Sequence, residues 1–140
     1  EEGLHFSMDN GITWKHHDIP QAPWLYMRCI KKRTDDSGVM FLSVGDKPSG
    51  ETGLLLRSRD FGKTWEDAGL PGHVNSTIWW IATNPADPNL IFCHTILGQI
   101  FRSTDGGESW KKMRRELGEI RMIAWQPTPA SQNREIYHAS

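Results

Sequence analysis

One eight-residue pattern occurs three times in this chain, over residues 7–14, 58–65 and 103–110. Each copy reads Ser-x-Asp-x-Gly-x-[Thr/Ser]-Trp, so four residue types recur at fixed offsets. Such a repeat indicates that the chain folds as several copies of one structural unit, and it constrains the fold more strongly than any local preference. We refer to the copies as the first, second and third box. Their recurring residues are Ser7, Asp9, Gly11 and Trp14, then Ser58, Asp60, Gly62 and Trp65, and finally Ser103, Asp105, Gly107 and Trp110.

The spacing of the boxes predicts how the units tile the chain. The box aspartates lie 51 and 45 residues apart, and the step from Asp105 through both chain ends to Asp9 is 44 residues. The segment Gly3–Phe6 before the first box lacks the apolar run that precedes the other boxes, and Glu135–Ala139 is similar to that missing run. We therefore expect one domain over 1–140, in which the chain starts and stops inside a unit. Its units would be 21–70, 71–118 and a junction unit made of 1–20 with 119–140.

Each unit reads as four short strands, with a box between the third and the fourth. Short β-branched and aromatic runs bounded by Gly, Pro, Asp and Asn are typical of strands. The box glycine can adopt a positive φ, and the box aspartate can accept backbone N–H bonds across the turn. The first strands of the units are expected at Leu25–Lys31, Ile78–Thr83 and Ile120–Trp125. The predicted fold class is all-β, a β-propeller built of four-stranded antiparallel blades with three blades per chain.

Three blades are too few for a propeller ring, which usually has about 4–8 blades. The other blades are expected from one of two sources. A second copy of the chain would give a six-bladed homodimer, or further copies a larger homo-oligomer, through a head-to-tail contact. Alternatively, the chain is a piece of a longer parent protein that supplies the remaining blades.

The repeated pattern resembles the Asp-box, or BNR repeat, of the sialidase-like β-propeller superfamily. Residues 81–110 resemble a whole unit of that superfamily, and the resemblance extends over essentially the whole chain. It implies that the boxes lie on the face opposite the ligand, so that all the box residues named above are structural. The first unit departs from the other two, because Phe6 stands where they have Arg57 and Arg102. The catalytic set of sialidases does not align with this chain, so the resemblance is specific for the fold and not for an activity.

Composition excludes several classes of partner. The chain has 16 Lys plus Arg against 17 Asp plus Glu, a formal net charge of −1 that offers no basic surface for nucleic acid. No apolar stretch is long enough to span a membrane, so we expect a soluble protein, inside or outside the cytoplasm. Cys29 and Cys93 are expected to be free and buried. No Cys/His/Asp spacing matches a metal motif, and no cofactor is predicted.

The first strands carry the candidate ligand-binding residues, since these strands line the central channel of a propeller. Alignment of the three units places Tyr26, Trp79 and Arg121 at equivalent positions, with Arg28 nearby on the first of these strands. Aromatic rings and guanidinium groups at a channel mouth could stack a sugar or bind a carboxylate. The alternative is that Arg121 pairs with Glu119 and the aromatic side chains only fill the channel wall.

Two functions remain open, and a third possibility is a chain that has neither a binding site nor a catalytic site. We favour a non-catalytic binding or assembly propeller that presents its aromatic and arginine-bearing channel face to a protein or carbohydrate ligand. The alternative is a glycoside hydrolase-like enzyme acting on a glycan, which would need two convergent carboxylates or a tyrosine nucleophile. Candidates for those carboxylates are Asp46, Glu51, Glu66 and Asp67. The third reading is a purely structural piece.

Overall fold

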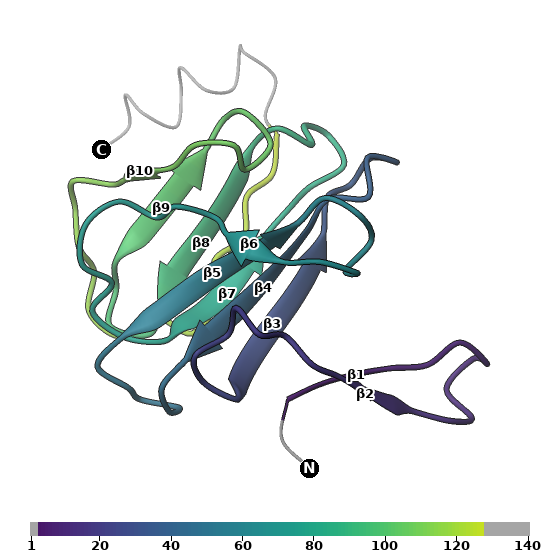
Figure 1. The fold of residues 1–140 in the computed structure, drawn as a ribbon. Coiled ribbons are helices and arrows are strands. Elements are labelled where there is room, and N and C mark those ends of the chain that lie inside the picture. The colour runs from purple at the N-terminus through teal and green to yellow at the C-terminus, as the bar shows by residue number, and fades with distance from the viewer. Residues whose placement is uncertain (1–2, 128–140) are drawn as a thin grey trace.

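The computed structural model of this protein describes residues 3–127. Within them the ordered elements are ten β-strands, which form one two-stranded and two four-stranded sheets (Figure 1). The N-terminal hairpin consists of β1 (Leu4–Phe6) and β2 (Lys15–His17). The first sheet contains β3 (Tyr26–Lys32), β4 (Met40–Gly45), β5 (Gly53–Ser58) and β6 (Glu66–Asp67). The second sheet contains β7 (Ile78–Ala82), β8 (Ile91–Thr95), β9 (Ile100–Ser103) and β10 (Lys111–Lys112).

Both four-stranded sheets are antiparallel meanders, with each strand paired to its neighbours in sequence. A box joins β1 to β2, β5 to β6, and β9 to β10. The all-β class is confirmed, and this strand order agrees with that of a propeller blade. The described residues hold two complete four-stranded units and the outer hairpin of a third, whereas three blades were expected. Glu135–Ala139, the expected second strand of the junction unit, lies outside the described residues. The number of blades and the closure of a ring therefore stay predictions.

The three boxes share one pattern of hydrogen bonds, which explains their recurring residues. In the second box, the Asp60 carboxylate accepts bonds from the Thr64 backbone at 2.9 Å and the Thr64 hydroxyl at 2.6 Å. The Ser58 hydroxyl donates to Asp60 at 2.8 Å and accepts the Gly62 N–H at 2.8 Å. Equivalent bonds, formed by the side chains of Asp9 and Ser7, and of Asp105 and Ser103, hold the other two turns.

Two apolar layers cover the two faces of the first sheet. One lies between the sheets, where Phe41 of β4 meets Ile81, Phe101 and Trp110 of the second sheet. The rings of Phe41 and Trp110 pack edge to face, with centroids 5.9 Å apart. The other layer joins Leu42, Val44, Leu56 and Trp65 to residues of the N-terminal segment such as Ile19 and Leu4. Successive strand residues thus serve opposite layers, as the two-residue period requires.

The segment Gly118–Trp125 follows a course over the second sheet similar to that of β7 over the first. After β3, the Thr34 hydroxyl donates to the Asn84 carbonyl, and after β7, the Asn84 amide donates to the Trp125 carbonyl at 3.0 Å. No strand forms at Ile120–Trp125, contrary to expectation. The physical reason is that a first strand can pair only with the second strand of its own unit, and none is present among the described residues.

Candidate ligand-binding site

Two of the candidate residues occupy β-bulges at the same place in the two sheets. The register of β3 against β4 shifts between Met27 and Cys29, and that of β7 against β8 shifts between Ile78 and Trp80. Arg28 and Trp79 are the extra residues. A bulge leaves its extra residue outside the ladder and re-aims the side chain. The structural counterpart of Trp79 is therefore Arg28 and not Tyr26, which corrects the alignment made from apolar positions.

The structure brings Arg28, Trp79 and Arg121 together. The Arg28 guanidinium carbon lies 4.4 Å from the centroid of the Trp79 ring, and that of Arg121 lies 5.3 Å from it. Trp79 is only 8% exposed, whereas the side chain of Arg121 is 66% exposed and Arg28 is also exposed. A buried indole that carries two exposed guanidinium groups is a cation–π arrangement that holds both cations at the surface.

Arg121 also pairs with the carboxylate of Glu119. The local ion pair expected as the alternative is therefore present, and the same side chain also lies over Trp79; its role in ligand binding stays a prediction. Glu119 is itself about half exposed, so solvent screens the pair strongly. Among the described residues no carboxylate pairs with Arg28, whose guanidinium instead lies over the Trp79 ring.

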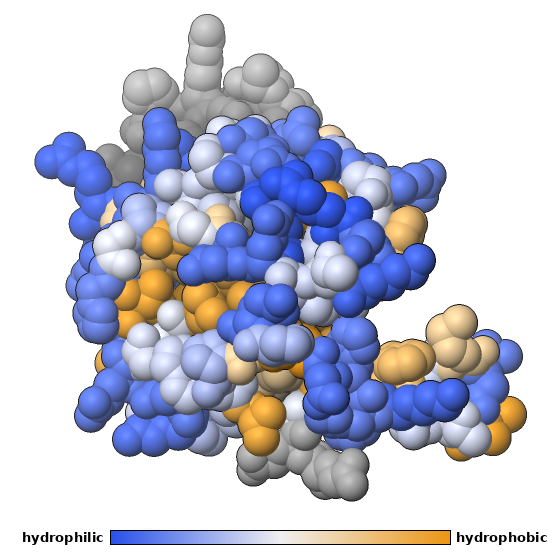
Figure 2. All heavy atoms as spheres, viewed as in Figure 1, coloured by the Kyte–Doolittle hydropathy of each residue, from blue (hydrophilic) through white to orange (hydrophobic). Residues whose placement is uncertain are grey.

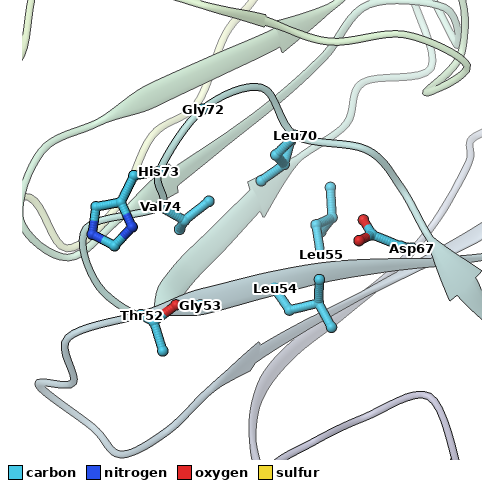
Figure 3. A pocket seen from close by; sticks show the side chains of 9 residues that line it. All are labelled: Thr52, Gly53, Leu54, Leu55, Asp67, Leu70, Gly72, His73 and Val74. Carbon is cyan, nitrogen blue, oxygen red and sulfur yellow. The ribbon is translucent and has the colours of Figure 1, made fainter.

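Tyr26 belongs to a different hollow, between the N-terminal hairpin and the start of β3. This hollow measures about 710 Å³ and also holds Trp24, Met27 and Asp46 among its lining residues. A smaller one, of about 230 Å³, lies between β5 and the loop that leads to β7 (Figure 3). Its lining mixes leucine and valine side chains with the polar Thr52, and its titratable groups are Asp67 and His73. Neither hollow includes Arg28, Trp79 or Arg121, so the candidate residues split into a group of three and Tyr26 alone.

Three of the four carboxylates considered for acid–base chemistry, those of Asp46, Glu66 and Asp67, are engaged locally. Asp46 accepts the Glu51 N–H at 3.3 Å and closes its own loop. Asp67 accepts the Gly69 N–H at 2.8 Å. Glu66 binds the guanidinium groups of Arg57 and Arg59, and its hydrogen bond from Arg59 lowers its pKa. None of these contacts joins two carboxylates at the Arg28–Trp79–Arg121 group.

The sequence analysis missed a charged cluster between the two sheets. Arg57 and Arg59 bind Glu66 of their own hairpin and Glu108 of the third box. Arg59 donates to the two Glu108 oxygens at 2.5 and 2.8 Å, a bidentate contact that depresses the pKa of Glu108. The strand pairing could have revealed the contact between Arg57 and Glu66, because residues just before and just after a box face each other across the hairpin.

The described residues were also compared with the expectations for metal binding, membrane spanning and the cysteines. No group of three or more His, Cys, Asp and Glu side chains in residues 3–127 could hold a metal ion. The same part of the chain contains no helix with the length and apolarity needed to cross a bilayer. Cys29 and Cys93 are free and buried, as expected, and burial raises the pKa of both thiols.

Comparison with known proteins identifies the family. The model of the Sortilin-Vps10 family, described as sortilin, neurotensin receptor 3, matches residues 2–140. The chain belongs to the Sortilin-Vps10 family. A sortilin from Danio rerio is 35% identical over 79 residues, which cover 56% of this chain and 9% of the zebrafish protein.

Membership of the Sortilin-Vps10 family refines the resemblance drawn from the boxes. The family match supports a propeller-type assignment and carries the name of a receptor, not of a sialidase. The aligned part of this Sortilin-Vps10 chain covers 9% of the length of the zebrafish sortilin. What that whole protein binds is therefore not a property shown for this chain.

Proposed function

We propose that this chain is part of a non-catalytic binding propeller whose channel face presents Arg28 and Arg121, held on Trp79, to an anionic group of a protein or carbohydrate ligand. The observation that carries the proposal is the position of both guanidinium groups over one buried indole. A planar guanidinium offers two parallel N–H donors to a carboxylate or a sulfate, and prior positioning reduces the entropy lost on binding.

The burial of Trp79 favours binding of an anionic group by the arginines over stacking of a sugar ring on the indole. A sugar ring that stacked on Trp79 would have to displace guanidinium groups that already lie over the indole. The indole is also 8% exposed, which leaves little surface for stacking. Recognition through the arginines requires no such displacement, apart from competition with Glu119 for Arg121. Trp79 is therefore a positioning residue, and Arg28 and Arg121 are the groups that touch the ligand.

The family supports binding over catalysis. The matching family model is named for a receptor. Three of the four candidate carboxylates for a glycoside hydrolase, Asp46, Asp67 and Glu66, are bonded to their own loops or to arginines. These contacts argue against their use as the acid pair that glycoside hydrolysis needs.

The test is a binding measurement with two charged probes, an oligoglutamate peptide and an oligouronate saccharide, and a neutral relative of each. We expect one charged probe to bind and its neutral relative to fail. Arg28→Ala and Arg121→Ala should each weaken binding about tenfold or more, since a charge-assisted hydrogen bond contributes about 1.5–3 kcal/mol. Arg115→Ala, at an exposed arginine outside the group, is the matched control and should leave affinity unchanged.

Two further variants test the role of Trp79. Trp79→Phe keeps an aromatic face and should retain most of the affinity, whereas Trp79→Leu should lose it although both arginines remain. Binding that survives both arginine variants, or failure of both charged probes, would contradict the proposal. Comparison of the peptide with the saccharide distinguishes a protein ligand from a carbohydrate ligand.

A further inference from the structure

The two arginines that lie over Trp79 differ in their own partners. Glu119 lies two residues before Arg121, and one of its carboxylate oxygens pairs with Nη2 of that arginine. Within residues 3–127 no carboxylate pairs with Arg28, which lies over the same indole. One of the two guanidinium groups proposed to bind an anion therefore already holds a carboxylate of its own chain, and the other does not.

The fold anchors the chain on both sides of Glu119. The Leu117 N–H donates to the Gly98 carbonyl at 3.0 Å, and the Ile120 N–H donates to the Ile96 carbonyl at 3.1 Å. Glycine at position 98 permits this close approach, because a Cβ there would come within 2.0 Å of the Leu117 carbonyl oxygen. The carboxylate of Glu119 thus belongs to a segment held on the turn between β8 and β9, and its place beside the guanidinium group is built into the fold.

The ion pair is open to exchange, because both partners lie at the surface. The side chain of Arg121 is 66% exposed and that of Glu119 is 53% exposed. Exposed ion pairs contribute little free energy, since water and salt screen the two charges. The contact of Arg121 with the Trp79 ring does not involve Glu119. An external carboxylate or sulfate can therefore replace Glu119 at a small cost and meet a guanidinium group that the indole still holds.

We propose that Glu119 is a resident carboxylate, which occupies Arg121 until an anion replaces it and so limits how tightly the site binds anions. A bound acid group takes over the contact with Arg121, and the side chain of Glu119 turns to solvent. The affinity of the site is thereby lower than two guanidinium groups without an internal partner would give. This inference rests on the proposed function, because it requires an anion to bind at the two arginines.

The test compares Glu119→Gln with the unaltered chain by isothermal titration calorimetry, with the oligoglutamate peptide and the oligouronate saccharide as probes. Glutamine keeps the size of the side chain and removes its charge. We expect Glu119→Gln to tighten the binding of the charged probe about two- to fivefold, the range that follows from the loss of an exposed ion pair. Glu119 is about half exposed, so the substitution should not disturb folding.

Two controls separate the contact with Arg121 from the general charge of the protein, whose surface is largely hydrophilic in the view of Figure 2. Glu116 lies on the same segment, is 49% exposed and pairs with Lys112. Glu116→Gln removes the same charge and should leave the affinity unchanged. The second control repeats Glu119→Gln together with Arg121→Ala. It should bring no gain over Arg121→Ala alone, because Glu119 acts through this guanidinium group.

Three results would overturn this inference and leave the proposed function intact. They are equal affinity of Glu119→Gln and the unaltered chain, an equal gain in Glu116→Gln, and a gain that persists when Arg121 is replaced by alanine. Failure of both charged probes to bind either the unaltered chain or Glu119→Gln would overturn the proposed function, and this inference with it.

Discussion

His94 is fully buried in the second sheet, and its two ring nitrogens have unequal surroundings. Nδ1 lies 2.9 Å from the Thr95 carbonyl, whereas Nε2 has no hydrogen-bond partner among the described residues. Burial lowers the pKa of this imidazole below its ordinary value of 6.5, so the folded protein favours the neutral ring. The unfolded chain then binds more protons than the folded one below about pH 6.5, and stability is lost as the pH falls through that range.

A histidine substitution tests this argument at the residue scale. His94→Gln removes the titrating group, so its free energy of unfolding should depend less steeply on pH between about 7 and 5 than that of the unaltered protein. Urea denaturation at several pH values measures the difference. His73→Gln, at an exposed histidine, is the control for the substitution itself. Equal slopes for the His94 variant and the unaltered protein would refute the assignment of a neutral buried ring.

The box turn is the element on which the repeat depends, and its aspartates make it acid-sensitive. Hydrogen bonds from the Thr64 hydroxyl, the Thr64 N–H and the Ser58 hydroxyl lower the pKa of Asp60 from 3.8 to about 2. A carboxylate with a depressed pKa stabilises the fold above its unfolded value, and this contribution disappears as the pH falls from about 4 to about 2. Asp60→Asn should lower stability at neutral pH and make the acid-induced loss shallower.

Asp9 offers the comparison for this element. It has the same bonds and the same pKa of about 2, but its hairpin projects away from the two sheets (Figure 1). Asp9→Asn should therefore affect the unfolding of the sheets less than Asp60→Asn. Thermal unfolding followed at two pH values checks both variants, and equal losses would mean that the first box supports the sheets as strongly as the second.

The box tryptophans predict a contrast of the same kind. Trp110 is 6% exposed and packs on Phe41, so Trp110→Ala should cost about 3–5 kcal/mol. Trp14 is 63% exposed, so Trp14→Ala should cost less than about 1 kcal/mol. Equilibrium denaturation measures both values. A large loss at Trp14 would indicate that the first hairpin is packed against another surface in solution.

Much of each element could be predicted from the sequence, because the box combines turn chemistry with flanking apolar alternation. The bounds of β3 and β7 differ by no more than one residue at either end from those expected for the first strands. The counterpart of Trp79 could not be predicted, since bulges at Arg28 and Trp79 shift the register without changing composition. The ion pairs of Glu108 were equally hidden, because this residue lies 49 residues beyond Arg59 and meets Arg57 and Arg59 only after the sheets pack.

At the scale of the whole molecule, the described residues form two packed sheets with a hairpin against one and a further segment against the other. The N-terminal hairpin packs on the first sheet through Leu4, and Gly118–Trp125 is hydrogen-bonded to the second unit, so the two described parts of the expected junction unit lie against different sheets (Figure 1). The completion of a ring, by a second copy or by a longer parent protein, stays a prediction.

The solution mass of the unaltered chain, measured by light scattering after size exclusion at micromolar concentration, tests this account most directly. A chain whose ring is completed by a longer parent protein should elute as a monomer of 16.0 kDa. A stable species of about twice that mass would contradict this prediction and would support a ring closed by two copies.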